Sequence, residues 1–249
     1  THDYNMDTRN DNIHIYINGF FFHRSEAKVS VMDSGYLLGD GVWEGIRLHK
    51  GTLIHLDAHL DRLFSGAKSI AMDIGLSCEE IILALRKTLE KNKMESDVHI
   101  RLIVSRGIKK TPYQHPKVTL GKPTVVIIPE YKKASEDVKE KGITLARVKT
   151  RRDHSIQDPR INSLSKHNCI AACIEADKLG ADEGLMLDPY DFVSTCNSTN
   201  FFIVKNGEVW TSTGEYCLNG VTRGSIIRLC EEYNIPIFEK NFNVEDVHS

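Results

Sequence analysis

The sequence has 249 residues, of which 41% are hydrophobic and 27% are charged, and its formal net charge is -2. This composition is typical of a soluble globular protein with one large domain or two modest ones. It gives no indication of nucleic-acid or membrane binding, and no stretch is long and apolar enough to span a bilayer. The polar start, residues 1–12, does not resemble a signal peptide. Six scattered cysteines without a CxxC pair predict reduced thiols in the cytoplasm and no metal site.

The first half of the chain is expected to mix strands with two helices. Asn18-Gly19 is a hairpin signal after an alternating strand. Apolar residues recur at helical spacing from Leu56 to Ile70, and Ser77 followed by Glu80 forms a capping box that opens a second helix. Further strands are predicted at Phe20–Ser30, Val42–His49, Thr52–Leu56, Val98–Ser105 and Thr124–Pro129.

The second half repeats this mixture after a polar, irregular stretch at 151–165. Helices are predicted over Lys166–Leu179, which stops at Gly180, and over Thr222–Tyr233. Strands are predicted at Ile143–Val148, Gly184–Asp188, Asn200–Lys205 and Glu208–Thr211. Since Gly107–Lys122 is a loop rich in lysine with two prolines, the predicted boundary gives one domain over residues 1–122 and another over 123–249.

Two places suit an anion. Arg62 offers a planar set of donors that matches phosphate oxygens, and residues 219–224 place Gly220, Val221 and Thr222 at the start of a helix, where free amides attract anions. Each signal alone has an ordinary alternative, which is a surface arginine in the first case and a plain helix cap in the second.

Five segments, in order along the chain, resemble fold-type IV (class IV) pyridoxal-phosphate enzymes. This family includes the branched-chain and D-amino-acid aminotransferases and aminodeoxychorismate lyase. The segments are VMDSGYLLGDGVWEGIR at 31–47, HLDRL at 59–63, GADEGLMLD at 180–188, NFFIV at 200–204 and GVTR at 220–223. The resemblance covers the chain from about residue 13 onward and implies an α/β (α+β) fold. It implies a small N-terminal α/β domain, a larger barrel-like C-terminal domain and a homodimer.

The resemblance also implies a cofactor and a reaction. Pyridoxal 5'-phosphate would be held at its phosphate by Arg62, Val221 and Thr222, and an amino group would move between a small amino acid and a 2-oxo acid. Two alternatives stay open, which are a carbon-carbon lyase of the aminodeoxychorismate type and a non-catalytic relative that binds a phosphorylated ligand.

The central lysine of the family is displaced. Counting back without gaps from residues 181–183 puts Asn162 at the position of the lysine whose amine forms the Schiff base and shuttles the proton. Lys166 is the nearest candidate, four residues on. One helical turn displaces its alpha carbon by roughly 5–6 Å while the side chain faces the same direction, so Lys166 could reach back into the site. A short gap in the alignment would have the same effect. The alternative is that Lys166 is a solvated residue near a helix start.

A second departure concerns the cofactor ring. The family places a glutamate near the pyridine nitrogen, and Thr195 occupies that position here. A hydroxyl can hydrogen-bond the nitrogen but carries no negative charge, so the ring would be a weaker electron sink.

The resemblance suggests three substrate-binding residues. Tyr36 matches a tyrosine that lines the substrate pocket, and Arg106 and His115 lie in a segment similar to the carboxylate-binding loop of the D-amino-acid enzymes. Tyr113 stands where that loop would carry an arginine, and the alternative for His115 is an exposed loop residue. The family continues past residues 246–247, so the C-terminal domain is expected to be truncated at its end.

Overall fold

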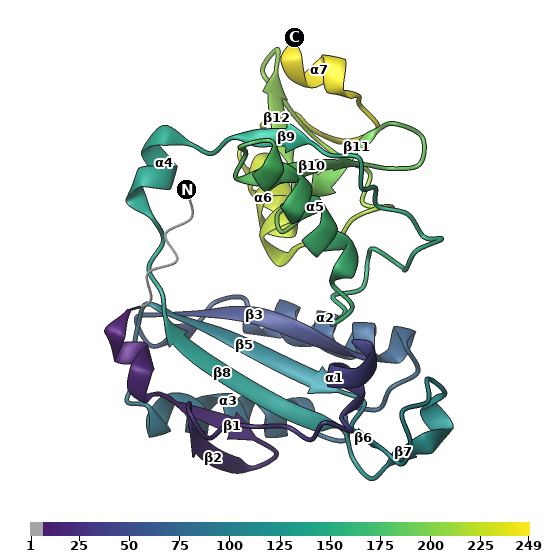
Figure 1. Cartoon of the computed structure of the whole chain (residues 1–249). Helices are drawn as coiled ribbons and strands as arrows, with labels where there is room; N and C mark the ends of the chain where they lie inside the picture. Colours follow the sequence, from purple (N-terminus) through teal and green to yellow (C-terminus); the bar gives the residue numbers. More distant parts are fainter. Residues whose placement is uncertain (1–6) are drawn as a thin grey trace. The chain divides into compact units, whose positions relative to one another are not determined.

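The computed structural model describes residues 7–249, and these divide into two compact units (Figure 1). The N-terminal unit comprises residues 7–134 together with Asn162–Ser165, and the C-terminal unit comprises Ser135–Ile161 and Lys166–Ser249. The division therefore follows Ala134 and not Lys122. The reason is that the strand after Lys122 pairs within the N-terminal sheet.

The N-terminal unit is built on a six-stranded antiparallel sheet in the order β2-β1-β8-β5-β3-β4. The strands are β1 (His14–Ile17), β2 (Phe20–His23), β3 (Gly41–His49), β4 (Thr52–Leu53), β5 (Val98–Ser105) and β8 (Thr124–Tyr131). The hairpin between β1 and β2 turns at Asn18 and Gly19, which both have positive φ, as their sequence predicts. Strand β2 ends at His23, so the prediction that this strand continues to Ser30 is wrong for the residues after His23.

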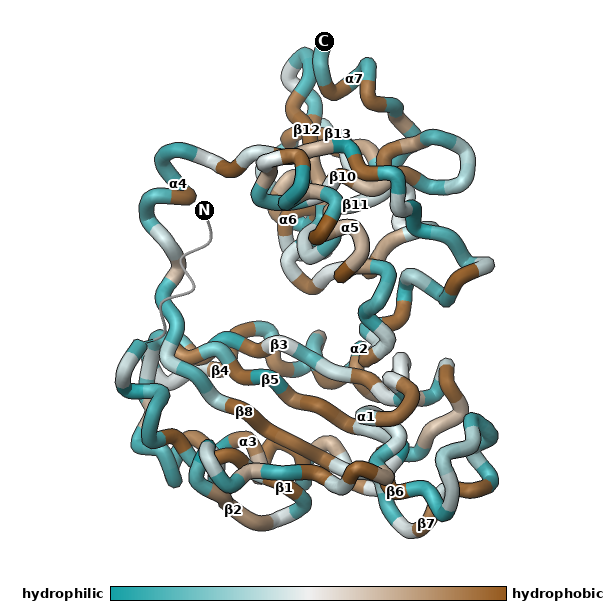
Figure 2. The backbone as a smooth tube through the Cα atoms, in the orientation of Figure 1, coloured by the Kyte–Doolittle hydropathy of each residue, from teal (hydrophilic) through white to brown (hydrophobic). Residues whose placement is uncertain are grey.

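Two helices, α2 (Leu56–Ser69) and α3 (Cys78–Lys91), pack against this sheet. Their apolar stripes and alternate residues of the central strands form the core, in which Leu60, Ile81, Leu85, Ile100 and Ile127 are almost completely buried. Figure 2 shows the corresponding hydrophobic bands along β5 and β8. Helix α3 begins at the predicted capping box, because Ser77 Oγ accepts from Glu80 N and Glu80 Oε2 accepts from Ser77 N.

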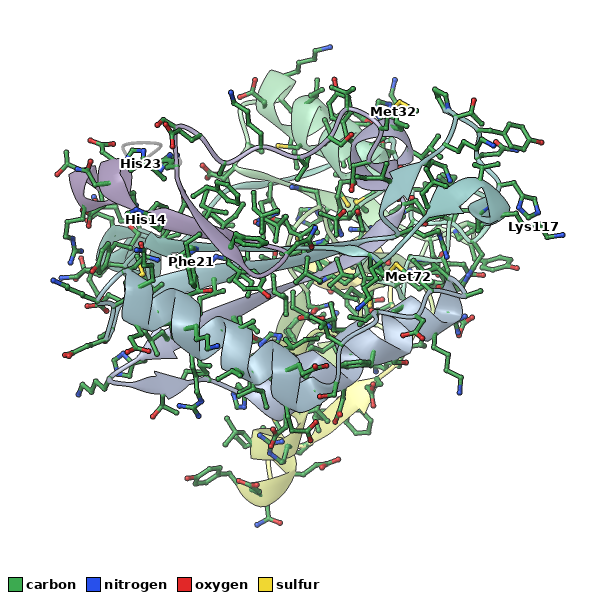
Figure 3. The ribbon with its side chains drawn as sticks, turned by 90° about the horizontal axis from the view of Figure 1, so that it is seen from below. His14, Phe21, His23, Met32, Met72 and Lys117 are labelled. Carbon is green, nitrogen blue, oxygen red and sulfur yellow. The ribbon has the colours of Figure 1, made fainter. Side chains whose placement is uncertain are left out.

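Short elements complete the N-terminal unit. They are the 3₁₀ helix η1 (Thr8–Asn12), helix α1 (Ser34–Leu38), the pair β6 (Ile108–Lys109) and β7 (Thr119–Leu120), and the 3₁₀ helix η2 (Pro116–Val118). Figure 3 shows His14 and His23 at one end of this unit and Lys117 in the β6–β7 excursion at the other. The segment Gly107–Lys122, expected to be a loop, therefore contains the short elements β6, η2 and β7.

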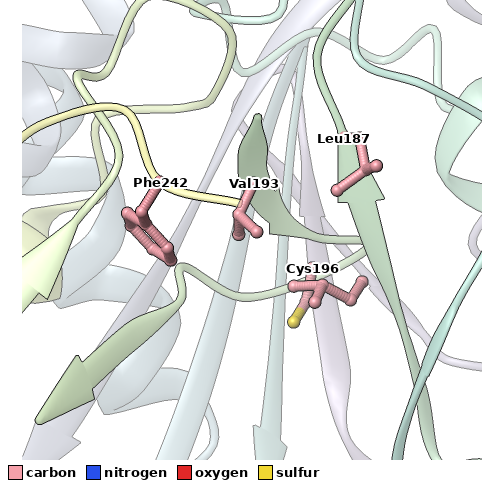
Figure 4. Packing of buried hydrophobic residues seen from close by; sticks show 5 residues of the cluster. Leu187, Val193, Cys196 and Phe242 are labelled. Atoms are coloured by element: carbon pink, nitrogen blue, oxygen red, sulfur yellow. The ribbon is translucent and has the colours of Figure 1, made fainter. Parts of the chain in front are cut away.

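The C-terminal unit contains two three-stranded sheets, ordered β11-β10-β9 and β12-β13-β14. The strands are β9 (Leu145–Arg147), β10 (Glu183–Leu187), β11 (Val193–Cys196), β12 (Phe202–Lys205), β13 (Glu208–Thr211) and β14 (Ile237–Glu239). The helices are α4 (Glu136–Lys141), α5 (His167–Lys178), α6 (Val221–Glu232) and α7 (Val244–His248). Leu187, Val193, Cys196 and Phe242 form a core cluster that residues of both sheets share (Figure 4).

The two units differ in the number of residues that they contain. Over residues 7–249, the C-terminal unit holds fewer residues than the N-terminal one, and the larger C-terminal domain implied by the resemblance stays a prediction. Strand β8 and residues 162–165 belong to the N-terminal unit because they pair with its strands. Among the residues from 7 onward, no helix is long and apolar enough to cross a membrane.

The sheet face that carries Trp43 on β3 and His99 on β5 is rich in cations. Arg101 lies with its guanidinium 4.2 Å from the Trp43 ring centroid, and a Cβ on Gly45 would lie 2.9 Å from His99 Nε2. Burial, followed by the nearby cations Lys132, Arg101 and Arg47, lowers the pKa of His99 from 6.5 to about 4.

We expect this histidine to make folding pH-dependent. Between pH 6.5 and 4 the unfolded chain binds a proton at this site and the folded chain does not, so the free energy of unfolding falls as the pH falls through this window. The loss expected from His99 is about 3 kcal/mol. Urea unfolding across pH 4–7 measures the free energy of unfolding at each pH. This free energy should depend less steeply on pH in His99→Gln than in the wild type. His49, which is also on β3 but exposed, provides the control, and His49→Gln should keep the wild-type pH dependence. Equal slopes in all three proteins would contradict the assignment.

Candidate functional site

Arg62 is fixed by a buried carboxylate of the neighbouring strand. Its Nε lies 2.7 Å from Glu44 Oε1 and its Nη2 lies 2.7 Å from Glu44 Oε2, which is a bidentate pair. His59, on the same face of α2 as Arg62, approaches Glu44 Oε2 with its Nδ1 at 2.7 Å. Because Glu44 is fully buried and the Arg62 side chain is 19% exposed, the guanidinium is held in one orientation at the surface of the unit.

Sequence reasoning missed the role of Glu44, although the residue lies inside the VWEGIR segment. A signal was present: Glu44 occupies an inward position of β3, between the buried residues Val42 and Ile46. A carboxylate at such a position needs a cationic partner, and Arg62 is that partner.

The turn before α6 has the form of an anion-binding helix start. Gly220 is the N-cap, and within the described part of the chain no side chain caps the first turn of the helix. A Cβ at Gly220 would lie 2.3 Å from Asn200 Oδ1, so only glycine fits here. Asn200 in turn donates from Nδ2 to Leu218 O at 2.9 Å and holds the turn in place. The first amides of α6, at Val221 and Thr222, are therefore available to an anion, and the donor set fits a phosphate.

Thr195 lies on β11 and is buried. Its hydroxyl donates to Thr199 O at 2.7 Å, so toward any further partner this hydroxyl acts as an acceptor. The adjoining turn is held by Glu183, a buried carboxylate that accepts from Ser198 Oγ at 2.7 Å and from Thr199 Oγ1 at 2.9 Å. Burial, and then the Glu183 charge, raise the pKa of the Cys196 thiol to about 12, so that thiol stays protonated.

Asn162 belongs to the N-terminal unit, where it pairs with β3. Its Nδ2 donates to Trp43 O at 2.8 Å, and Trp43 N donates to Asn162 O at 3.1 Å. Leu164 N donates to Gly41 O at 3.0 Å, and Ser163 forms a bridge with Val42. Residues 162–165 thus form a short extended segment along β3.

This segment corrects the expected geometry of Lys166. Asn162 and Lys166 do not lie one turn apart on a helix, because α5 begins only at His167 and Lys166 is its N-cap. Four residues of extended chain span up to about 13 Å. Lys166 belongs to the C-terminal unit and is half-buried.

The three predicted substrate residues have different surroundings in the N-terminal unit. Tyr36, on α1, is 72% exposed. His115 is exposed, and its Nδ1 accepts from Lys117 N at 3.1 Å as the cap of η2.

Arg106 is buried and fully engaged. Its Nε and Nη2 donate to Asp40 at 2.6 and 3.1 Å, and its two terminal nitrogens donate to the carbonyls of Ile70 and Ala71. Arg106 therefore connects the end of α2 to the segment before β3, and its expected binding of substrate stays a prediction. The sequence gives no spacing signal for the Arg106–Asp40 pair.

The chain is similar to known proteins over most of its length. Residues 41–249 match the family described as amino-transferase class IV. The chain belongs to this family. The chain is 38% identical over 239 residues to a putative branched-chain-amino-acid aminotransferase of Methanocaldococcus jannaschii, covering 94% of this chain and 81% of that protein.

Two further class IV relatives have different names. A branched-chain-amino-acid aminotransferase-like protein of Arabidopsis thaliana is 38% identical over 227 residues, which are 91% of this chain but only 41% of that protein. A D-alanine aminotransferase of Staphylococcus aureus is 31% identical over 234 residues, covering 93% of this chain and 80% of that protein.

Solved structures agree with the fold. The branched-chain aminotransferase of Thermoproteus uzoniensis superposes with a TM-score of 0.84 at 28% identity, over 95% of this chain and 80% of that one. The mixed α/β fold and the aminotransferase class predicted from the five sequence segments are therefore confirmed.

Proposed function

We propose that this chain is a pyridoxal-phosphate-dependent aminotransferase that moves an amino group between a small amino acid and a 2-oxo acid. The observation that carries the proposal is the uncapped start of α6 at Gly220, whose close approach to Asn200 excludes any side chain. Arg62, preoriented by Glu44, is the second element suited to a phosphate. The names of the Methanocaldococcus and Staphylococcus relatives support the reaction class.

Four residues would hold the cofactor. Arg62 and the amides of Val221 and Thr222 would bind its phosphate, and Thr195 would lie near its ring nitrogen. When bound, pyridoxal phosphate supplies an electron-withdrawing ring that stabilises negative charge at the alpha carbon of the amino acid. Since the Thr195 hydroxyl already donates to Thr199 O, it would only accept a hydrogen bond from the ring nitrogen, without the charge of a carboxylate.

Lys166 is our candidate for the amine that takes the proton from the substrate's alpha carbon. Asn162 has no amine, and its side-chain amide is committed to the Trp43 carbonyl. Lys166 Nζ is the nearest lysine amine in the sequence and extends from the start of α5. A lysine in this role acts as the general base, which contributes about 10²- to 10⁴-fold to the rate in enzymes.

The proposed substrates are a small amino acid and a 2-oxo acid. Tyr36 and His115 are our first candidates for contacts to the substrate, because all three side-chain nitrogens of Arg106 already donate to Asp40 or to the carbonyls of Ile70 and Ala71. The related Thermoproteus uzoniensis enzyme was crystallised with norvaline, which is a small amino acid.

We also infer a homodimer in the cytoplasm. The six cysteines, all free thiols, are consistent with a reducing compartment.

A second candidate function rests on the two positions at which this chain departs from the family pattern. Asn162 and Thr195 replace the amine and the charge that amino transfer uses, and a relative with both changes would bind the cofactor phosphate without turnover. This candidate differs from the first at one measurable step, because only the first releases a 2-oxo acid.

Turnover by the purified full chain distinguishes these functions. With added pyridoxal phosphate, a panel of small L- and D-amino acids and a 2-oxo acid acceptor, we expect a new 2-oxo acid to form in proportion to the enzyme. Saturable cofactor binding without product would favour the non-catalytic relative, and pyruvate release from aminodeoxychorismate would favour the lyase. Absence of both binding and turnover would contradict the proposed function.

A further inference from the structure

A group of basic residues lies in the N-terminal unit, where η1, the start of β1, the end of β8 and the C-terminal end of α3 meet. A cavity of about 380 Å³ opens here to the surface. Its walls include Arg9, His14, Lys91, Lys93 and Tyr131. The end of the unit that carries His14 is visible in Figure 3. The volume is within the range of small-molecule sites.

The walls of this cavity are held in place by hydrogen bonds. Asn92 Oδ1 accepts from His14 N at 2.7 Å, and Asn92 Nδ2 donates to the carbonyls of His14 and Thr88 at 2.9 and 2.8 Å. Arg9 lies with its guanidinium 3.8 Å from the Tyr131 ring centroid and is held there by Asp7. The cavity is therefore formed before any ligand arrives, which lowers the entropic cost of binding.

The charges of the lining have one sign. Arg9, Lys91 and Lys93 line the cavity, and no carboxylate of the described residues does. Arg9 is partly neutralised by Asp7. Over residues 7–249, Lys91 and Lys93 form no ion pair. Within that range, two ammonium groups two residues apart therefore stand beside one opening without an ion-pair partner of their own.

Capping of α3 does not account for these lysines. The carbonyls of Thr88, Leu89 and Glu90 at the end of the helix accept from the backbone amides of Asn92, Met94 and Lys93, respectively. The orphan carbonyls that a lysine side chain often satisfies at a helix end are thus already paired, and the ammonium groups are available to a ligand.

We propose that this cavity binds a small multivalent anion, either a di- or triphosphate or a polycarboxylate. Lys91 and Lys93 supply the charge, His14 and Asn12 offer further polar groups, and the Tyr131 ring forms an apolar wall. None of the lining residues belongs to the candidate site for pyridoxal phosphate, so the inference stands independently of the proposed function.

The test uses two anions and a charge-matched pair of variants. Calorimetric titration of the full chain with pyrophosphate and with citrate should give saturable binding that weakens as the salt concentration rises. In K91E/K93E we expect the affinity to fall about tenfold or more, because two attractive charges become repulsive. R86E/K87E changes the same net charge on exposed residues of α3 outside the cavity and should keep the wild-type affinity.

The Arg62→Ala variant separates this cavity from the cofactor site. Binding that persists in Arg62→Ala and is lost in K91E/K93E supports the proposal, and binding by only one of the two anions identifies the ligand class. Binding that is lost in Arg62→Ala, or that falls equally in R86E/K87E, would overturn it. Should K91E/K93E fold poorly by circular dichroism, K91Q/K93Q removes the charges without reversing them, and retained affinity in that variant would also overturn the proposal.

Discussion

Replacing Lys166 with alanine is expected to lower the rate of amino transfer about a thousandfold, because the variant lacks the amine that takes the proton from the alpha carbon. The measurement is 2-oxo acid release at saturating pyridoxal phosphate and amino acid. Phosphate binding should persist, since Arg62 and the α6 start are unchanged, so equilibrium dialysis of the cofactor should show that the variant still binds it.

Three comparisons make this result specific to Lys166. Lys178→Ala removes an exposed lysine from the other end of α5 and should keep full activity. Added methylamine should restore part of the rate in Lys166→Ala, which a merely misfolded protein would not allow. Borohydride reduction of the wild type with pyridoxal phosphate, followed by peptide mapping, should label Lys166. A label on another lysine, or full activity in Lys166→Ala, would disprove the assignment.

Replacing Glu44 with alanine should have the largest effect on stability. The substitution leaves Arg62 and His59 without the buried carboxylate that both contact at 2.7 Å. Removing one partner of a buried ion pair costs about 3–5 kcal/mol, and the partial exposure of Arg62 puts the expected loss near the lower end of this range, about 3 kcal/mol. Urea unfolding at pH 7 measures this loss, and the cofactor should bind more weakly because Arg62 is no longer held in one orientation.

The control for Glu44 is a carboxylate that is more exposed. Glu130, on β8, lies 3.6 Å from Arg24 with 38% of its side chain exposed, so Glu130→Gln should cost less than about 1 kcal/mol. Glu44→Gln keeps the side-chain volume and removes only the charge. Its loss of unfolding free energy should therefore lie between the losses for Glu130→Gln and Glu44→Ala. A Glu44→Ala protein as stable as Glu130→Gln would show that Arg62 does not depend on Glu44.

Local signals in the sequence predicted most helices and turns. Asn18-Gly19 predicts its turn because few residue pairs tolerate positive φ at both positions, and Ser77 with Glu80 predicts the start of α3 because the two side chains satisfy each other's backbone amides. The start of α6 after Gly220 was also predictable, because a glycine before a helix is a local pattern, whereas anion binding there stays a prediction.

Contacts between distant segments were not predictable. The partner of Arg62 is 18 positions away on a strand, and the pairing of Asn162 with Trp43 joins residues 119 positions apart. A polar, irregular stretch such as 151–165 has no hydrophobic period, so nothing in it predicts an added sheet segment. The roles of Lys166, Thr195, Tyr36 and His115 stay predictions for the same reason, since they depend on tertiary position and not on local pattern.

The pairing of residues 162–165 with β3 also has a consequence for synthesis on the ribosome. The chain leaves the N-terminal unit after Ala134, runs through residues 135–161 of the other unit, and returns for four residues before leaving again. The N-terminal sheet therefore cannot gain this last segment until residue 165 has emerged, after the beginning of the other unit has already been made. A fragment ending at residue 134 would lack that segment and leave the edge of β3 at Gly41–Trp43 unpaired, open to adventitious strand pairing.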